Sequence, residues 1–299
     1  MHYYYIYGLN LASTIAFPEA EEIPPCTSPD AEIILSTPPE WVMEEYRQGK
    51  FSSISEDIMW FRLNDELLIY VEHGRKALVW KIFQELDDVR MRTYILSGAI
   101  TFLLFQRHFL LIHGSALYYN GKAYLVSGAS GSGKSTTALS LLKLPGVQFA
   151  ADDICATRIH GNECILHPGP PWQKVCEDVQ RLDTCHEYTY IEEIGTKYGR
   201  KLSDRFVSVP VPIGGMFIIS REDCPQLLTR QLLGGEKLKA LTCNLFRGEL
   251  LNLLGITPDR MAQFVATANC FPMWLISRPV NADTLAEVTD FIYHTFSGK

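Results

Sequence analysis

The sequence predicts an α/β protein with a small β-rich module in its N-terminal part. Short apolar runs separated by turn signals fill much of the first 82 residues, as is typical of short strands. Further along, a glycine-rich loop at residues 128–135 lies between a strand-like run and a helix-like run. Strand-like and helical segments then follow to the C-terminal end. We therefore expect two domains, residues 1–100 and residues 101–299, with a boundary near residue 100.

The N-terminal module is expected to consist of short strands and one helix. The expected strands lie at residues 3–17, 54–60, 66–71 and 76–82, where apolar and aromatic side chains alternate with polar ones. A proline-rich, acidic stretch at residues 18–39 predicts a loop with short ordered pieces. Residues 90–109 are apolar on most faces and predict a helix that links the module to the second domain.

The second domain is expected to begin with a hairpin. Residues 110–113 and 122–126 are apolar and flank Asn120-Gly121, which is a strong signal for a tight turn. Residues 156–212 form a less regular, more polar stretch. Further strands are expected at 147–151, 215–219 and 273–277, and helices at 237–253, 258–268 and 282–296. Asn281 or Asp283 is placed to cap the closing helix.

Composition narrows the class of protein. The chain has 299 residues and a net charge of −7, which argues against a broad nucleic-acid-binding surface. Its eight cysteines form no C-x-x-C pair and no zinc-ligand pattern, as expected for thiols in a reducing cytosol. The first residues lack a signal peptide's basic and apolar segments, and the most apolar run, residues 94–105, is too short to span a bilayer. We expect a cytoplasmic protein without a membrane partner.

The loop Gly128-Ala-Ser-Gly-Ser-Gly-Lys-Ser135 fits the phosphate-binding pattern G-x-x-x-x-G-K-[ST] at every fixed position. Its glycines let backbone N–H groups point inward, and the following helix adds its positive N-terminal end. Lys134 is expected to reach the phosphates of ATP, and the Ser135 hydroxyl to ligate Mg²⁺. The expected nucleotide-binding residues are Ser130, Gly131, Ser132, Gly133, Lys134, Ser135 and Thr136.

Acidic and imidazole side chains near this loop are the candidates for catalysis. Asp152 and Asp153 end a strand shortly after the loop's helix, and two adjacent acids can divide metal binding and proton abstraction between them. Such a pair also occurs as a helix cap or as plain loop solvation. His113 ends an apolar strand, where a lone histidine is more often structural than catalytic.

Residues 113–135, followed by Ala151-Asp-Asp153, resemble the HPr kinase/phosphorylase superfamily. That family has a His-Gly strand before its phosphate loop and an acidic pair after it. The resemblance continues through Pro168-Gly-Pro-Pro171, the basic segment Lys197-Tyr-Gly-Arg-Lys201 and Pro210-Val-Pro212. At the front, residues 7–19 are similar to the start of HPr-kinase-like proteins, some of which are lasso-peptide kinases encoded with peptide-tailoring systems.

The resemblance implies a P-loop kinase core of the HPr-kinase/PEP-carboxykinase type and a role for each candidate residue. Asp152 would be the general base and His113 would position or support it. Ser135 and Asp153 would organise Mg²⁺. Arg200 or Lys201 would neutralise charge in the transition state, although a basic segment is usually only a solvated face. HPr kinases also assemble as oligomers, which implies a homo-oligomer.

The leading hypothesis is an ATP- and Mg²⁺-dependent kinase that phosphorylates a serine hydroxyl of a peptide or small protein, with a lasso or other ribosomal precursor peptide as one candidate acceptor. The alternatives are a kinase for a small metabolite and a nucleotide-sensing switch without phosphotransfer. Two features depart from the family. Thr136 stands where HPr kinases usually carry Glu, and the downstream motif associated with their phosphorylase activity is absent, so the reverse reaction is not expected.

Overall fold

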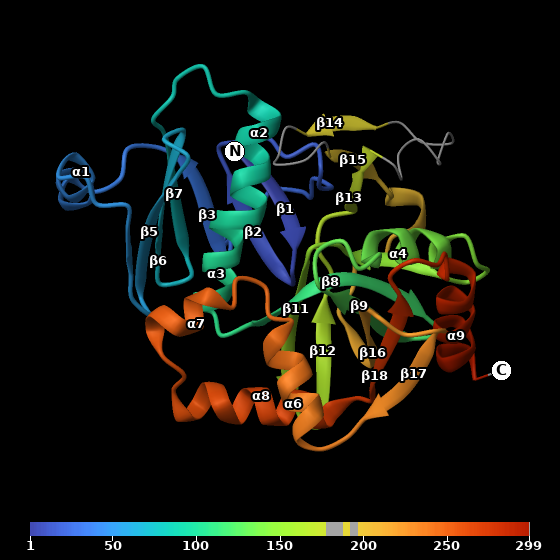
Figure 1. Cartoon of the computed structure of the whole chain (residues 1–299). Helices are drawn as coiled ribbons and strands as arrows, with labels where there is room; N and C mark the ends of the chain where they lie inside the picture. The colour runs from blue at the N-terminus through green and yellow to red at the C-terminus, as the bar shows by residue number, and fades with distance from the viewer. Residues whose placement is uncertain (178–187, 192–196, 299) are drawn as a thin grey trace. The chain divides into compact units, whose positions relative to one another are not determined.

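The computed structural model describes residues 1–177, 188–191 and 197–298 (Figure 1). The chain forms two compact units. The first comprises Met1–Phe109, a short segment that begins at Tyr190, and Glu249–Gly255, and the second comprises the remaining described residues. The boundary expected near residue 100 falls inside a continuous helical run, and the first unit extends to Phe109.

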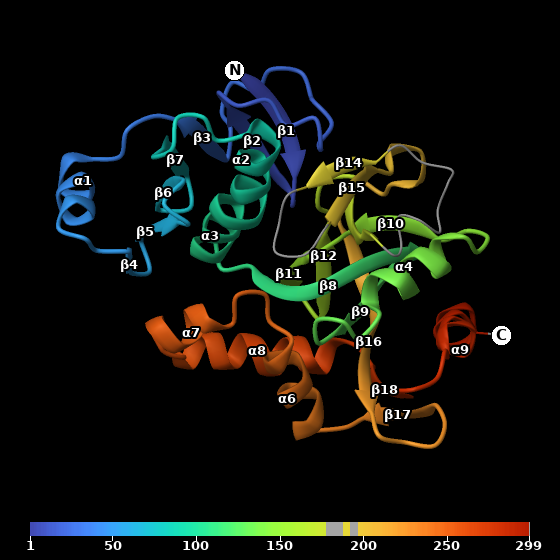
Figure 2. The ribbon, with the colours of Figure 1, turned by 45° about the horizontal axis from the view of Figure 1, so that its top comes forward.

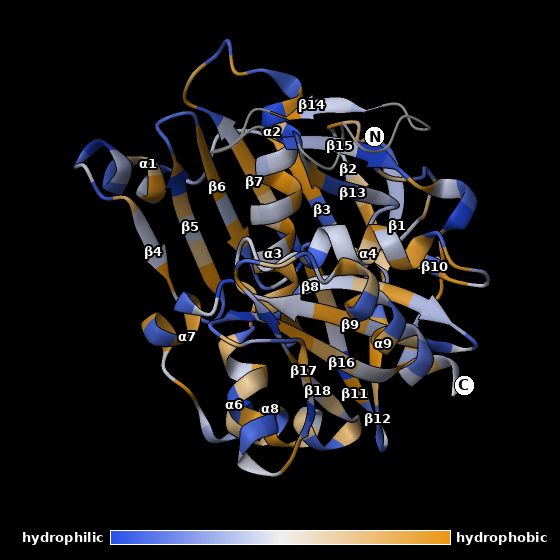
Figure 3. Ribbon diagram, turned by 45° about the vertical axis from the view of Figure 1, so that its right-hand side comes forward, coloured by the Kyte–Doolittle hydropathy of each residue, from blue (hydrophilic) through white to orange (hydrophobic). Residues whose placement is uncertain are grey.

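The first unit contains a seven-stranded sheet in the order β1-β2-β3-β7-β6-β5-β4. Its strands are β1 (His2–Ile6), β2 (Leu9–Ser13), β3 (Ala31–Leu35), β4 (Ser52–Ile54), β5 (Ile58–Leu63), β6 (Leu67–Glu72) and β7 (Lys76–Lys81). Pairing is antiparallel except that β3 runs parallel to both β2 and β7. Five of the six residues of β6 are buried, and Figure 3 shows β6 and β7 largely in the hydrophobic colour. The expected β-rich character of this region is confirmed.

Two details of this unit differ from the sequence prediction. The strand expected at residues 54–60 is wrong, because the chain turns between β4 and β5 and Ser55 Oγ donates to the carbonyl of Ile58. Residues 40–47, for which the sequence predicted no element, form helix α1 (Glu40–Arg47), whose Val42 is buried beside Trp60 of β5. The short buried face of α1 explains why periodicity alone missed it.

The helix predicted at residues 90–109 is present and runs from Asp88 to Gln106 as α2 (Asp88–Tyr94), a π-helical segment η1 (Ile95–Ala99) and α3 (Ile100–Gln106). The hydroxyls of Thr93, Ser97 and Thr101 each donate to the carbonyl four residues earlier. Such back-bonding satisfies polar side chains on a helix that is buried on most faces.

We predict that Asp87→Ala destabilises the protein by about 1 kcal/mol. Asp87 caps this helix, since its carboxylate accepts from the backbone N–H groups of Val89 and Arg90. Urea unfolding measures the difference. Asp88→Ala is the matched control, because Asp88 is exposed and accepts no helix N–H group in the contacts described; an equal loss in both variants would contradict the capping role.

The second unit contains an eight-stranded sheet in the order β10-β8-β11-β12-β16-β18-β17, in which β9 pairs with β8 and β16. Its strands are β8 (Leu110–Tyr119), β9 (Lys122–Gly128), β10 (Gln148–Ala151), β11 (Ile154–His160), β12 (Glu163–His167), β16 (Val211–Glu222), β17 (Leu228–Leu232) and β18 (Met273–Pro279). Strands β9, β16 and β18 are adjacent and parallel. The predicted β8–β9 hairpin is confirmed, and both turn residues, Asn120 and Gly121, have positive φ angles.

The expectation of a less regular stretch at residues 156–212 is wrong in its described part. β11 and β12 form a hairpin there, and β13 (Trp172–Cys176) pairs antiparallel with β15 (Lys197–Lys201). The stretch also contains β14 (Thr189–Ile191) and the 3₁₀ turn η2 (Ser203–Arg205), while residues 178–187 and 192–196 lie outside the described residues. Polar side chains on these strands hid the alternating pattern, because the strands have exposed faces.

Helices flank this sheet. α4 (Lys134–Leu142) and α9 (Leu285–Ser297) contact each other and share a core with Val126 of β9 and Phe217 of β16 (Figure 2). The helix predicted at residues 237–253 is interrupted and forms α6 (Gly235–Cys243) and α7 (Glu249–Leu254), of which α7 belongs to the first unit, whereas α8 (Pro258–Cys270) matches its prediction. Asp283, one of the two expected caps, lies one residue before the N-cap position Thr284, and its carboxylate accepts from the N–H of Leu285 at the start of α9. In the described part of the chain, no helix is long and apolar enough to cross a bilayer.

Candidate active site

The glycine-rich loop connects the end of β9 to the start of α4, as the motif requires. Gly131 and Gly133 both have positive φ angles, and Gly133 precedes the helix in the left-handed conformation. The curved backbone therefore leads directly into a helix N-terminus, where N–H groups lack intrahelical acceptors. Lys134 Nζ donates to the carbonyls of Gly128 and Ala129, at 2.9 and 3.0 Å, so its charge lies over the loop.

Strand β8 presents His113 and Ser115 to the acidic pair. Residues two apart on a strand share one face, and Gly114 lies between them. Asp152 and Asp153 occupy the tight connection between β10 and β11, both of which pair with β8. Asp153 adopts a φ of 68°, which turns the chain sharply enough for both carboxylates to face β8. The hydroxyl of Ser115 donates to Asp152, whereas His113 contacts Asp153.

Asp152 is held in an environment that favours its neutral form. Its Oδ1 accepts from Ser115 Oγ at 2.6 Å, and its Oδ2 accepts from the backbone N–H of Lys174 at 2.9 Å. Burial is the largest influence and, together with the neighbouring negative charge of Asp153, raises the pKa of Asp152 to about 6 against the opposing hydrogen bonds. A carboxylate with a pKa nearer neutrality is a stronger base than an ordinary aspartate.

Asp153 is held in the ionised form. Its Oδ1 lies 3.3 Å from His113 Nδ1, and its Oδ2 lies 3.7 Å from Lys174 Nζ. Burial opposes ionisation, but the hydrogen bond from His113 and the charges of Lys174, His113 and Lys197 lower the pKa of Asp153 to about 2. The environments of the two adjacent carboxyl groups therefore shift their pKa values in opposite directions, upward for Asp152 and downward for Asp153.

We predict that Gly114→Ala destabilises the protein by about 1–3 kcal/mol, because a Cβ at this position would lie 2.5 Å from the carbonyl oxygen of Val126 on β9. Denaturant unfolding measures the loss. Gly121→Ala is a useful comparison, since no atom lies within 4 Å of its Cβ position and only its positive φ opposes alanine. A stable Gly114→Ala variant would contradict the close approach of β8 and β9.

A cavity of about 520 Å³ joins the loop to the acidic pair. It lies where the carboxyl ends of β9 and β16 and the end of β18 meet, which is the usual ligand position in parallel α/β sheets. It is lined by Ser130, Gly131, Gly133, Lys134, Ser135 and Thr136 of the loop and α4, and by His113, Asp152 and Asp153. Ser132 is buried beneath the loop, and its hydroxyl has no partner among the described residues.

The structure does not bring Arg200 or Lys201 into this cavity. Arg200 is 3 % exposed, and its guanidinium donates to Gln173 Oε1 across the β13–β15 pair. Lys201 is exposed at the end of β15. The same pair of strands instead contributes Lys174, from the middle of β13, and Lys197, from the start of β15, to the lining.

Sequence reasoning missed several residues that line the cavity, among them Ser115, Lys174, Arg221 and Arg278. Ser115 was accessible to prediction, since it is two residues after His113 on the same strand. Arg221 and Arg278 each follow an apolar run predicted as a strand, and parallel strands bring their carboxyl ends together. Lys174 gave no comparable signal, because its strand lies in the stretch expected to be irregular.

The oxygen donors in the cavity suit a hard cation such as Mg²⁺. Ser135, Asp152 and Asp153 all supply oxygen ligands, and Mg²⁺ in proteins commonly uses one or two carboxylates together with phosphate oxygens and waters. Among the described residues there is no cluster of three or more acidic, histidine or cysteine side chains placed to hold a metal. The site therefore fits a metal that arrives with a phosphate ligand better than one caged by protein alone.

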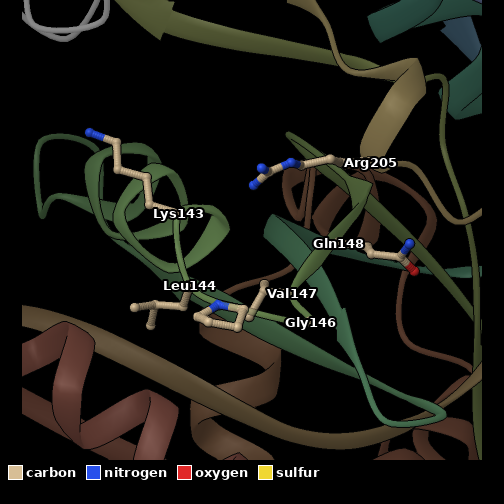
Figure 4. A pocket seen from close by; sticks show the side chains of 7 residues that line it. Lys143, Leu144, Gly146, Val147, Gln148 and Arg205 are labelled. Atoms are coloured by element: carbon tan, nitrogen blue, oxygen red, sulfur yellow. The ribbon is translucent and has the colours of Figure 1, made fainter.

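A second cavity, of about 470 Å³, lies at the other end of α4 (Figure 4). Lys143, Gln148 and Arg205 contribute to its wall, and Arg205 donates to the carbonyl of Leu142 at the helix C-terminus. A cation placed there complements the helix dipole and satisfies an unpaired carbonyl. Among the described residues, no acidic side chain and no residue of the glycine-rich loop lines this cavity, so it does not share the chemistry of the first.

No protein-family model and no curated protein matches the chain. Among solved structures, the chain is similar to the Hpr(Ser) kinase/phosphatase from Coxiella burnetii, with a TM-score of 0.33 and 13% identity. The match covers 63% of this chain and 91% of that chain. The relationship is distant, and at this level of similarity residue roles do not transfer. The chemistry of the cavity follows from its own side chains.

Proposed function

We propose that the protein is an ATP- and Mg²⁺-dependent kinase that transfers the γ-phosphate to a serine hydroxyl of a peptide or small protein. The observation that carries this proposal is the geometry of one cavity, which Lys134 and Ser135 of the glycine-rich loop and its helix line together with the adjacent acids Asp152 and Asp153. We further propose that the second unit is a P-loop core of the HPr-kinase/PEP-carboxykinase type, on the strength of its loop and acid motifs.

In this proposal the cavity performs an in-line displacement. The acceptor oxygen attacks the γ-phosphorus, the bond from that phosphorus to the β–γ bridging oxygen breaks, and ADP leaves. Asp152 receives the acceptor proton, since a carboxylate with two hydrogen-bond donors still has lone pairs available. The backbone N–H groups of residues 130–135 and the Lys134 charge hold the phosphates.

Asp153 and Ser135 would hold Mg²⁺ in the same proposal, and the metal would neutralise charge on the phosphates. His113 supports Asp153 rather than Asp152, because its Nδ1 faces the Asp153 carboxylate. Lys174 and Lys197 replace Arg200 and Lys201 as the cations nearest the acid pair. Thr136 lines the cavity at the first turn of α4, where its polar side chain faces the nucleotide site.

The experiment is incubation with Mg·ATP and serine-containing precursor peptides encoded beside the gene, followed by mass measurement of the products. Gain of phosphate mass on a peptide serine, lost in Asp152→Asn, supports both the peptide acceptor and the base. ATP consumption without peptide modification favours a small-metabolite acceptor. Tight ATP binding with neither product favours a nucleotide-sensing switch and would overturn the kinase proposal.

We also propose a cytoplasmic homo-oligomer, because family members of this type assemble from several copies. Size-exclusion chromatography with light scattering tests the assembly. A monomer at all concentrations would contradict the oligomer without touching the kinase proposal, since the loop and the acid pair on which that proposal rests line one cavity within a single chain.

A further inference from the structure

Two arginines lie at the side of the cavity away from the acid pair. Arg221 and Arg278 are the next-to-last residues of β16 and β18, and the two residues are directly paired in the parallel register. Neighbouring side chains at paired positions of adjacent strands project from the same face of the sheet. Two positive charges therefore lie side by side at the carboxyl ends of the parallel strands, and both line the cavity.

Arg278 is the buried member of this pair. The residue is 5 % exposed, and its Nε has no hydrogen-bond partner among the described residues. Its guanidinium lies against the glycine-rich loop, since a Cβ added to Gly133 would meet Arg278 Nη1 at 2.7 Å. Burial and the neighbouring charge of Arg221 lower the pKa of Arg278, against the opposing charges of Asp283 and Glu287. A buried cation next to a like charge is unfavourable unless an anion compensates it.

The protein itself supplies little compensation. The nearest carboxylate, Asp283 Oδ1, is 3.9 Å from Arg278 Nη2, and the Asp283 side chain is 89% exposed. Asp283 also accepts the N–H of Leu285, the first residue of α9, which keeps it at that helix terminus. An exposed carboxylate at such a distance contributes little to stability. The pair is therefore poised for an anionic ligand that enters the cavity.

The order of the strands in the sheet indicates which part of a bound nucleotide would lie beside Arg221 and Arg278. In this part of the sheet the strands follow one another as β8, β9, β16 and β18. β8 and β18 are thus three strand spacings apart, roughly 14 Å. The transferred phosphate must lie within reach of Asp152, beside β8. The phosphates that are not transferred then extend over the loop toward β16 and β18.

We propose that Arg278, assisted by Arg221, forms the subsite for the α- and β-phosphates of the nucleotide, the group that leaves as the nucleoside diphosphate. This inference rests on the proposed function and adds the direction in which the nucleotide lies: the γ-phosphate faces the acid pair and the diphosphate faces the arginines. Guanidinium groups suit this role, because they bind phosphate oxygens through two parallel hydrogen bonds.

The test is calorimetric titration of the full chain with Mg·ADP and with a non-hydrolysable ATP analogue. Arg278→Met is expected to weaken both ligands by the same factor, about 10–100-fold, because it removes contacts that both share. Arg278→Lys keeps the charge and recovers part of the affinity. Arg221→Met gives a smaller loss for both ligands, since Arg221 is exposed. Thermal unfolding verifies that each variant is folded.

Arg230→Met is the matched control, because Arg230 is exposed on β17 and pairs with Glu236; it should bind both ligands like the wild type. Unchanged ADP affinity in folded Arg278→Met overturns the subsite, and a loss confined to the ATP analogue overturns the proposed direction. If the wild type binds neither ligand, the proposed function fails as well, whereas wild-type binding with an unaffected Arg278→Met variant rejects the subsite alone.

Discussion

Asp152→Asn is expected to lower the rate of phosphoryl transfer by about 10²–10⁴-fold, the usual contribution of a general base. The amide is nearly the same size and can still accept from the N–H of Lys174, so the geometry of the β10–β11 connection is kept. What is lost is the ability to receive the acceptor proton. Rates of ATP-dependent phosphate transfer to the acceptor, measured with saturating nucleotide, report the change.

The same substitution is expected to stabilise the fold at neutral pH by about 1–3 kcal/mol, since the pKa of Asp152 is raised from 3.8 to about 6. The folded state binds this proton more tightly than the unfolded state. The contribution of Asp152 to the stability of the wild-type protein therefore falls as the pH rises from about 4 to about 6, and it stays reduced above that range. Asparagine removes this penalty, so the gain is largest above pH 6.

Asp153→Asn is expected to change stability with the opposite sign. The pKa of Asp153 lies at about 2, below its ordinary value of 3.8, so its contribution is fully present above about pH 4 and is lost as the pH falls toward 2. Its removal should destabilise the protein at neutral pH. Asp223→Asn, on an exposed turn, is the neutral control. Equal destabilisation by Asp152→Asn and Asp153→Asn would contradict the division of roles between the two acids.

Lys134→Met is expected to lower the transfer rate by about 10²–10³-fold and to weaken ATP binding. Its ammonium group lies over the loop, 2.9 Å from the carbonyl of Gly128, and is the cation of the loop itself. Replacing it with an uncharged side chain of similar length removes the proposed phosphate contact and leaves the start of α4 intact. Transfer rates and calorimetric titration with ATP measure the two effects.

Lys143→Met is the matched control for this prediction. Lys143 caps the other end of α4, is exposed and does not line the cavity with the acid pair. Its replacement should leave both the rate and the affinity for ATP unchanged. If Lys134→Met binds ATP as tightly as the wild type and reacts as fast, the loop does not hold the phosphates and the nucleotide site is elsewhere.

The sequence predicted the elements that local chemistry determines. The glycine-rich loop, the Asn120-Gly121 turn and the adjacent acids each depend on a few consecutive residues, and the structure places all of them as expected. The long helix before residue 109 was also predictable, because its apolar residues cover most of its faces. Such features can be predicted because their chemical groups and the backbone conformation that they require both belong to one short segment.

The parts that depend on pairing between distant segments could not be predicted in the same way. Arg200 and Lys197 belong to one basic segment, and only the register of β15 against β13 decides that Arg200 meets Gln173 while Lys197 lines the cavity. The partner of His113 likewise depends on the turn at Asp153. Arg278 lies 144 positions after Lys134 in the sequence, and the parallel pairing of β18 with β16 brings it to the cavity.

A site-resolved titration of the aspartate carboxyl groups tests the division of roles most directly and requires no knowledge of the acceptor. The protein is labelled with ¹³C at the aspartate carboxyl carbons, and the Asp152→Asn and Asp153→Asn variants assign the two resonances. The Asp152 resonance is expected to titrate at about pH 6, and the Asp153 resonance to remain ionised to about pH 2. Two ordinary titrations near pH 4 would contradict the assignment of base and metal ligand to this pair.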